Sequence, residues 1–183
     1  MRRERIQAGI VLLMLILPLQ ALAERHALVI GNSQYQYSPL KNPRNDARDM
    51  AAVLKDLGYR IAGGGAQLDL DAESFDRVFH DFLKTLRNGD IAVFYFAGHG
   101  ASAKQENYLI PINSRISHSA QLRHRSTPLY EVIESLKVAN PDGLNALFVD
   151  ACRDQPFGRS FRTSDRGLAR LGSVPSGTFI SLA

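Results

Sequence analysis

The chain has 183 residues, of which 45% are hydrophobic and 22% are charged, with one Cys, no Trp and a formal net charge of +4. This length suits one globular domain with a substantial core, and the ordinary apolar fraction argues against a disordered or low-complexity chain. A single Cys excludes an intrachain disulfide and a multi-cysteine zinc site. Residues 24–152 carry 14 basic and 15 acidic side chains, which excludes a basic domain face for nucleic acid.

The first 23 residues have the organisation of a secretory signal peptide. A basic head with three arginines precedes an apolar run over residues 8–17 and the small-residue ending Ala21-Leu22-Ala23. A run of about ten apolar residues is short against the roughly 20 that a membrane-spanning helix needs, so the pattern predicts cleavage after Ala23. We expect an exported protein, periplasmic or secreted, with no stable membrane insertion after cleavage. An uncleaved membrane anchor is the alternative.

After this leader, short apolar runs alternate with amphipathic segments. Apolar periodicity and turn residues predict, in chain order, a strand at 26–30, a helix at 46–57, a strand at 59–61, a helix at 73–87, strands at 91–97 and 108–111, a helix at 128–139, and strands at 144–149 and 178–182. Continuous apolar strands separated by helices are typical of a mostly parallel sheet covered on both faces. The predicted fold class is therefore α/β, a three-layer α/β/α sandwich.

Two of the predicted buried strands end in reactive residues. His99 follows the strand at 91–97, and Cys152 follows the strand at 144–149. Reactive groups gather at the carboxyl ends of parallel strands, so we expect both at one edge of the sheet. An imidazole that takes the proton of a thiol makes it an effective nucleophile, which indicates an acyl-transfer site. The alternative is a small buried Cys152 and a structural His99.

Five motifs along the chain belong to a known pattern. They are His26-Ala27-Leu28-Val29-Ile30-Gly31-Asn32, Asn45-Asp46-Ala47-Arg48-Asp49-Met50, Tyr95-Phe96-Ala97-Gly98-His99-Gly100, Asn107-Tyr108-Leu109-Ile110-Pro111 and Asp150-Ala151-Cys152-Arg153. With them, the chain resembles the caspase-like cysteine peptidases, the group that includes metacaspases and bacterial orthocaspases. His99 also precedes Cys152 by about 50 residues, as in caspases.

The resemblance implies roles for the matching residues. Cys152 corresponds to the nucleophile and His99 to the general base and acid. The backbone N–H groups of Gly100 and Cys152 correspond to the donors of an oxyanion hole. Residues 24–183 correspond to the peptidase domain, with the catalytic and linker loop at 152–176. The family usually continues further, so we expect the last strand or strands of the domain to be missing.

Two acidic residues predict the specificity. Asp150 stands where the caspase signature has Gln, as it does in metacaspases and orthocaspases, and Asp46 matches a second acidic pocket residue of those families. Two carboxylates facing one pocket attract Arg or Lys and repel Asp. We therefore expect cleavage after basic residues. A helix N-cap is the other role open to Asp46.

A short basic tail follows the Cys. In the resembling family this linker is where self-cleavage occurs, so the resemblance implies self-processing in this part of the chain. The candidate sites are Arg159, Arg162, Arg166 and Arg170. A solvated basic loop without processing is the alternative.

The expected partner is a protein or peptide substrate, not nucleic acid, and the sequence does not specify the oligomeric state. No metal or other cofactor is expected. Calcium activates some members of the resembling family, but aspartates such as Asp69 and Asp71 do not have the spacing of a calcium loop. Two competing hypotheses are a catalytically silent caspase-like module that binds partners and a fragment of a larger multidomain protein.

Overall fold

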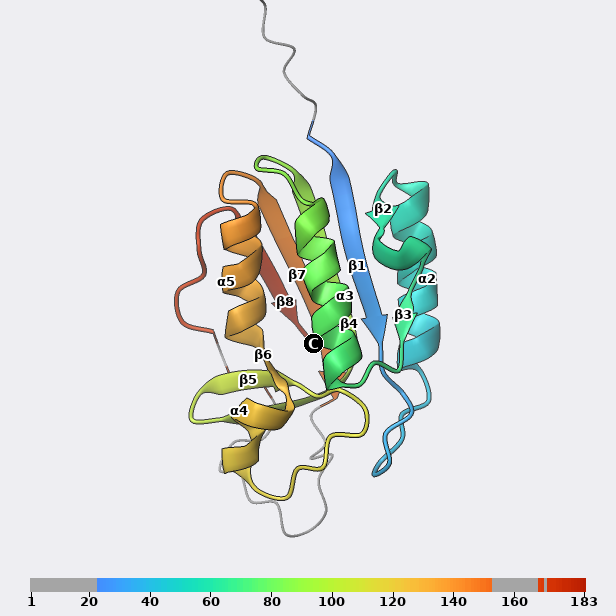
Figure 1. Ribbon diagram of the computed structural model, residues 1–183, viewed down its shortest axis with the longest axis vertical. Helices are drawn as coiled ribbons and strands as arrows, with labels where there is room; N and C mark the ends of the chain where they lie inside the picture. The colour runs from blue at the N-terminus through green and yellow to red at the C-terminus, as the bar shows by residue number, and fades with distance from the viewer. Residues whose placement is uncertain (1–22, 153–167, 170) are drawn as a thin grey trace, which may run out of the picture.

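The computed structural model describes residues 23–152, 168–169 and 171–183. Its elements, in chain order, are β1 (Arg25–Gly31), α2 (Pro43–Asp56), β2 (Arg60–Ile61), the 3-10 helix η1 (Ala62–Gly64), β3 (Gln67–Leu68), α3 (Ala72–Thr85), β4 (Ile91–Ala103), β5 (Glu106–Leu109), the 3-10 helix η2 (Ser119–Gln121), α4 (Leu122–Arg125), β6 (Thr127–Pro128), α5 (Leu129–Ala139), β7 (Leu144–Cys152) and β8 (Thr178–Leu182) (Figure 1). The predicted signal peptide lies outside the described residues, apart from Ala23.

A parallel sheet forms the centre of the molecule (Figure 1). β1 and β7 flank β4, β8 adds to β7, and the short strands β2 and β3 pair with the far side of β1, all in parallel. Across the three central strands, Val29 lies opposite Tyr95 and Tyr95 opposite Phe148. The predicted mostly parallel sheet is confirmed.

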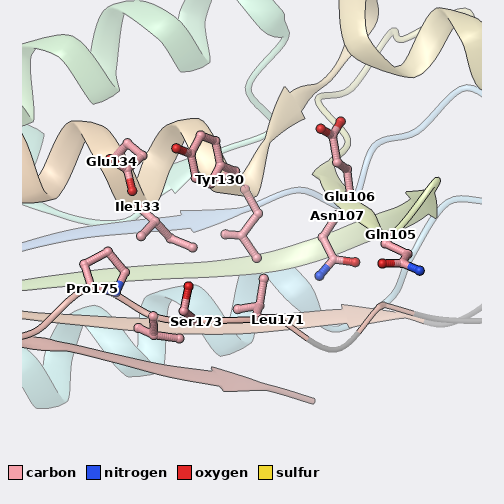
Figure 2. Close-up of a pocket in the computed structure, with 12 residues that line it drawn as sticks. Gln105, Glu106, Asn107, Tyr130, Ile133, Glu134, Leu171, Ser173 and Pro175 are labelled. Atoms are coloured by element: carbon pink, nitrogen blue, oxygen red, sulfur yellow. The ribbon is translucent and has the colours of Figure 1, made fainter.

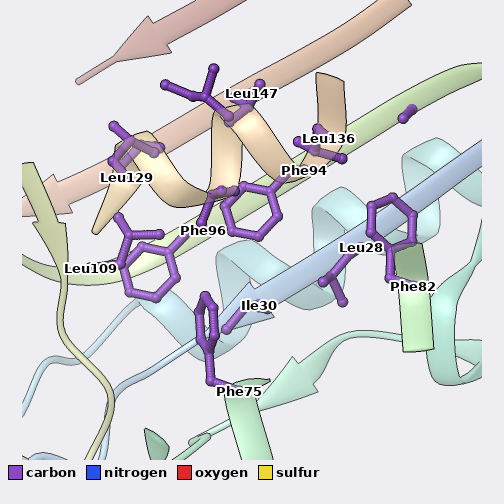
Figure 3. Close-up of a cluster of buried hydrophobic side chains, with 14 of the residues drawn as sticks. Leu28, Ile30, Phe75, Phe82, Phe94, Phe96, Leu109, Leu129, Leu136 and Leu147 are labelled. Atoms are coloured by element: carbon purple, nitrogen blue, oxygen red, sulfur yellow. The ribbon is translucent and has the colours of Figure 1, made fainter. Parts of the chain in front are cut away.

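Helices cover both faces of this sheet. Side chains alternate between the faces of a strand, so each strand contributes to two layers of core. On one face α2 packs with its buried Ala47, Ala51 and Leu54. On the other face α3 and α5 enclose the larger core, whose labelled members in Figure 3 are Leu28, Ile30, Phe75, Phe82, Phe94, Phe96, Leu109, Leu129, Leu136 and Leu147. The three-layer α/β/α architecture is the predicted one.

The strand β4 is longer than predicted. We expected it to end at Ala97, but it continues to Ala103. β1 accompanies β4 as far as Ala97, and from Gly100 the antiparallel strand β5 takes over the pairing. The replacement partner keeps the backbone hydrogen bonds satisfied, so the chain has no reason to turn at the glycines. His99 therefore lies within a strand and not in the turn after one.

Helix boundaries differ from the predictions by a few residues. α2 begins at Pro43, three residues before the predicted Asp46, because proline fits the first turn of a helix, where its missing N–H is not needed. α3 begins after Asp71, whose carboxylate accepts the N–H of Ser74 at 2.9 Å. α5 begins at Leu129, so Pro128 precedes the helix instead of lying in its first turn.

In the described part of the chain, no helix combines the length and the apolar character needed to cross a membrane.

Candidate active site

The two residues predicted to be catalytic lie side by side at the carboxyl edge of the sheet. In the parallel pairing of β4 and β7, His99 is opposite Cys152, and this pair closes a register that begins at Ile91 and Leu144. His99 is only 1% exposed. The fold therefore brings together two positions that are far apart in the sequence, because α5 returns the chain to the start of a strand parallel to β4.

A backbone carbonyl defines the protonation of the His99 ring. Nε2 of His99 lies 2.7 Å from the carbonyl oxygen of Ser38. A carbonyl oxygen can only accept a hydrogen bond, so Nε2 carries the proton and donates it. In neutral His99 the nitrogen that can take up a proton is then Nδ1. This is the tautomer of an imidazole that acts as a base through Nδ1.

The loop that carries Ser38 is anchored to the chain before α3. Oδ1 of Asp69 accepts the backbone N–H groups of Ser33 and Gln34 at 2.8 and 2.9 Å. Oδ2 of the same carboxylate lies 3.3 Å from the guanidinium of Arg44. These contacts fix both the start of the loop and the start of α2. Asp69 thus has a structural role in holding the loop beside His99.

Sequence reasoning missed the loop residues that contact His99. Besides Ser38, the Tyr35 ring packs against the His99 ring, with 4.3 Å between their centroids. Ser38 acts through its backbone carbonyl, which any residue would offer, so no side-chain pattern could have identified it. Tyr35 stands in a segment that the sequence indicates only as a polar loop.

The charges of the two acidic residues predicted to bind substrate act on the same buried tyrosine. Tyr95 lies in β4, beneath α2, and is 6% exposed. Its pKa is raised to about 12, chiefly by burial and in addition by the charges of Asp150 and Asp46. Asp150 is exposed in β7 opposite Ala97, and Asp46 is half-buried in the first turn of α2. Both carboxylates therefore lie within electrostatic reach of Tyr95.

The alternative role of Asp46 as a helix N-cap is wrong. The N-cap of α2 is Asn42, and no side chain caps the helix there. Because the helix begins at Pro43, Asp46 lies inside its first turn. A carboxylate at this place still interacts favourably with the helix dipole, but its oxygens are not engaged as a cap.

Gly100, the other residue predicted for the oxyanion hole, sits where only a glycine fits. A Cβ at this position would lie 2.8 Å from Cβ of Ala151 and 3.1 Å from Cδ2 of Leu168. Its backbone is paired with Leu109 in the hairpin of β4 and β5. The backbones of Gly100 and Cys152 thus meet at the end of the two strands, next to His99.

The described residues contain no group of three or more His, Cys, Asp or Glu side chains that could hold a metal ion. Asp69 and Asp71 have other partners, since Asp69 anchors the loop and Asp71 caps α3. A hydrogen bond from Ser74 lowers the pKa of Asp71, in keeping with a cap that accepts as a carboxylate.

The four candidate self-processing arginines lie outside the described residues.

A pocket of about 510 Å³ lies between β5, the first half of α5 and residues 171–175. Figure 2 shows Tyr130, Ile133 and Glu134 of α5 facing Leu171 and Pro175 across it. Neither His99 nor the two acidic residues line this pocket.

Comparisons with known proteins identify the family of this chain. The family model of the caspase domain matches residues 24–176. The chain is 27% identical over 131 residues to mucosa-associated lymphoid tissue lymphoma translocation protein 1 of Homo sapiens, and equally to its homologue in Mus musculus. That stretch is 71% of this chain but 15% of each relative, so the chain spans only a small part of their length.

The fold is similar to that of a solved structure, protein GSU0716 from Geobacter sulfurreducens. The TM-score is 0.54 at 16% sequence identity, over 70% of this chain and 50% of that one. At this identity the likeness concerns the fold alone. The family match, in contrast, covers most of the chain and includes both His99 and Cys152. The chain belongs to the caspase-like cysteine peptidase family.

Proposed function

We propose that this chain is a cysteine endopeptidase of the metacaspase or orthocaspase type, with Cys152 as nucleophile and His99 as general base and acid. The observation that carries the proposal is the register of β4 and β7, in which His99 lies opposite Cys152 at the carboxyl edge of the sheet. This edge is where parallel sheets present their reactive groups. The imidazole is also held in one tautomer, with its proton on Nε2 and donated to Ser38.

The proposed reaction has two halves. Nδ1 of His99 takes the proton of the Cys152 thiol, and the thiolate attacks the carbonyl carbon of the scissile bond. When the C–N bond breaks, the imidazolium returns that proton to the leaving amine, and a thioester remains on Cys152. A water molecule, deprotonated by His99, then hydrolyses the thioester and restores the thiol. The backbone N–H groups of Gly100 and Cys152 stabilise the negative oxygen in both halves.

The proposed substrates carry Arg or Lys before the scissile bond. Asp46 and Asp150 support this, because both carboxylates act on the same buried Tyr95, and Asp150 lies in β7 shortly before Cys152. A guanidinium or ammonium near these carboxylates would form charge-assisted hydrogen bonds. An aspartate side chain would meet two like charges there and be rejected.

Fluorogenic peptides that end in Arg, Lys or Asp test this proposal directly. We expect cleavage after Arg and Lys, none by Cys152→Ala, and a loss of roughly 10- to 100-fold in kcat/KM for the Arg peptide in Asp150→Asn or Asp46→Asn. Asp142→Asn, which removes an exposed carboxylate at the opposite end of β7, is the matched control. Cleavage only after Asp would overturn the basic specificity. No cleavage of any peptide would favour the catalytically silent module.

We also propose that the enzyme processes itself in the basic linker. The full chain incubated alone should give fragments whose new ends map to Arg159, Arg162, Arg166 or Arg170. The Cys152→Ala chain should stay intact. Cleavage of purified Cys152→Ala at the same arginines would show that another protease is responsible, and an intact active chain would leave these arginines as a basic loop without processing.

The proposed chemistry draws its nucleophile and base from Cys152 and His99 and needs no metal. Peptidase activity should therefore persist in excess EDTA, and a dependence on added Ca²⁺ would instead indicate calcium activation.

We further propose that the chain is exported to the periplasm or secreted after cleavage behind Ala23. Mass spectrometry of the exported protein should find Glu24 at its N-terminus, and a retained residue Met1 would indicate an uncleaved leader.

A further inference from the structure

Tyr35 makes three contacts with the segment around His99. Its hydroxyl accepts the backbone N–H of His99 at 2.9 Å and donates to the carbonyl oxygen of Ile110 at 2.9 Å. Its ring lies against the imidazole, with 4.3 Å between centroids. The side chain is 8% exposed although it belongs to a loop. Tyr35 is therefore part of the interior that surrounds the catalytic histidine.

The tyrosine hydroxyl completes the pairing of the two strands at His99. Opposite residues of an antiparallel pair can exchange two N–H to carbonyl hydrogen bonds. Here the N–H of Ile110 donates directly to the His99 carbonyl at 3.0 Å. The return bond runs through Tyr35, whose hydroxyl lies between the His99 N–H and the Ile110 carbonyl. The hydroxyl thus bridges β4 and the residue after β5 beside His99.

Gly98 leaves the space that this hydroxyl occupies. A Cβ at position 98 would lie 2.6 Å from Oη of Tyr35, closer than real Cβ atoms approach a neighbour. The glycine that precedes His99 therefore makes room for the tyrosine. The motif Gly98-His99 and the distant Tyr35 form one packed unit.

We propose that Tyr35 is a positioning residue for His99, holding its backbone through the hydroxyl and its imidazole through the ring. The inference rests on the proposed function of His99 as the base for Cys152. The carbonyl oxygen of Ser38, in the same loop, accepts the hydrogen bond of His99 Nε2. One short loop therefore contacts both the backbone and the ring of the histidine. Loss of the hydroxyl leaves a buried N–H and a buried carbonyl without their shared partner, and the strand relaxes to satisfy them. A shift of about 1 Å at a catalytic group can lower a rate by roughly 100-fold.

The variant Tyr35→Phe isolates the hydroxyl, because it keeps the ring that packs on His99. We expect it to lower kcat by about 10- to 100-fold with little change in KM, since the hydroxyl contacts the catalytic base and not the substrate. Tyr37→Phe, in the same loop but 63% exposed, is the matched control and should behave like the wild type. Thermal unfolding of both variants checks that each is folded.

The pH profile of thiol alkylation gives a readout that does not depend on peptidase activity. The chain has one Cys, so iodoacetamide reports on Cys152 alone. In the wild type we expect rapid alkylation to extend into the acidic range, because imidazolium favours the thiolate. In Tyr35→Phe the profile should move toward higher pH, as for a thiol whose imidazole is displaced.

The outcomes distinguish a failure of the proposed peptidase function from a failure of the proposed role of Tyr35. A wild type that cleaves no peptide would refute the proposed function, while the alkylation profiles would still decide the role of Tyr35. A Tyr35→Phe variant with wild-type kcat and an unchanged alkylation profile would overturn the inference. If Tyr35→Phe does not fold, Gly98→Ala tests the same contact by displacing the hydroxyl. An unchanged profile in that variant would refute the inference as well.

Discussion

His99 and Cys152 are opposite partners at the end of the parallel pair formed by β4 and β7. The ladder that leads to them is continuous over the whole length of β7. Beyond this pair, β4 continues into a hairpin with β5. His99, the proposed base, is consequently held by backbone pairing on both of its sides.

Removing the side chain of Asn32 should destabilise the fold. Asn32 is fully buried, and its amide accepts the N–H of Leu70 at 2.9 Å and donates to the Leu70 carbonyl at 3.3 Å. Asn32→Ala leaves two buried backbone groups without a partner, so we expect a loss of about 2–4 kcal/mol in the free energy of unfolding. Urea denaturation measures it. Asn45→Ala, at an exposed position in α2, is the control, and an equal loss there would contradict the explanation.

Gly31→Ala should lower the free energy of unfolding, although it adds only one methyl group. A Cβ at position 31 would lie 2.4 Å from the backbone oxygen of Pro43 and 2.6 Å from Cβ of Ala47. Relief requires α2 to move away from β1, for which we expect a cost of about 1–3 kcal/mol. Gly65→Ala, which meets no atom within 4 Å, should leave the urea midpoint nearly unchanged. Similar midpoints for the two variants would show that α2 adapts without strain.

The cap of α3 should make a pH-dependent contribution to stability. The hydrogen bond from Ser74 lowers the pKa of Asp71 in the folded state. The contribution is therefore present above the unfolded pKa, near 4, and is lost as the pH falls through the lower folded value. We expect Asp71→Ala to cost about 1 kcal/mol at neutral pH and less in acid. Unfolding curves at both pH values measure this, and a difference that grows in acid would contradict the assignment.

Alkaline pH should destabilise the fold partly through Tyr95. Its folded pKa is raised to about 12 by burial and by the charges of Asp150 and Asp46, whereas an unfolded tyrosine titrates near 10. Above pH 10 the unfolded chain loses this proton first, so stability falls as the pH rises from about 10 to 12. Tyr95→Phe should lose less stability than the wild type between about pH 8 and pH 11. Equal losses would show that this tyrosine does not contribute.

The sequence alone was enough to predict the sandwich and the position of His99 and Cys152 at one edge of its sheet. Runs such as Ala27 to Ile30 are apolar throughout, which is the mark of a strand buried on both faces, and the position of Cys152 at the end of such a strand already suggested its chemistry. The two acidic residues, Asp46 and Asp150, were also evident from their places in the motifs. These features are local, because they depend on periodicity and on residue type at fixed spacing.

Only the tertiary structure decided how His99 is held. The carbonyl of Ser38, the hydroxyl of Tyr35 and the anchoring carboxylate of Asp69 act over 30 or more positions in the chain, and one of them is a backbone group that any residue carries. The continuation of β4 beyond Ala97 likewise depends on β5 replacing β1 as its partner. Side-chain patterns report which face of an element is buried. They do not report which distant backbone groups complete its hydrogen bonds, and at this site those groups determine the geometry.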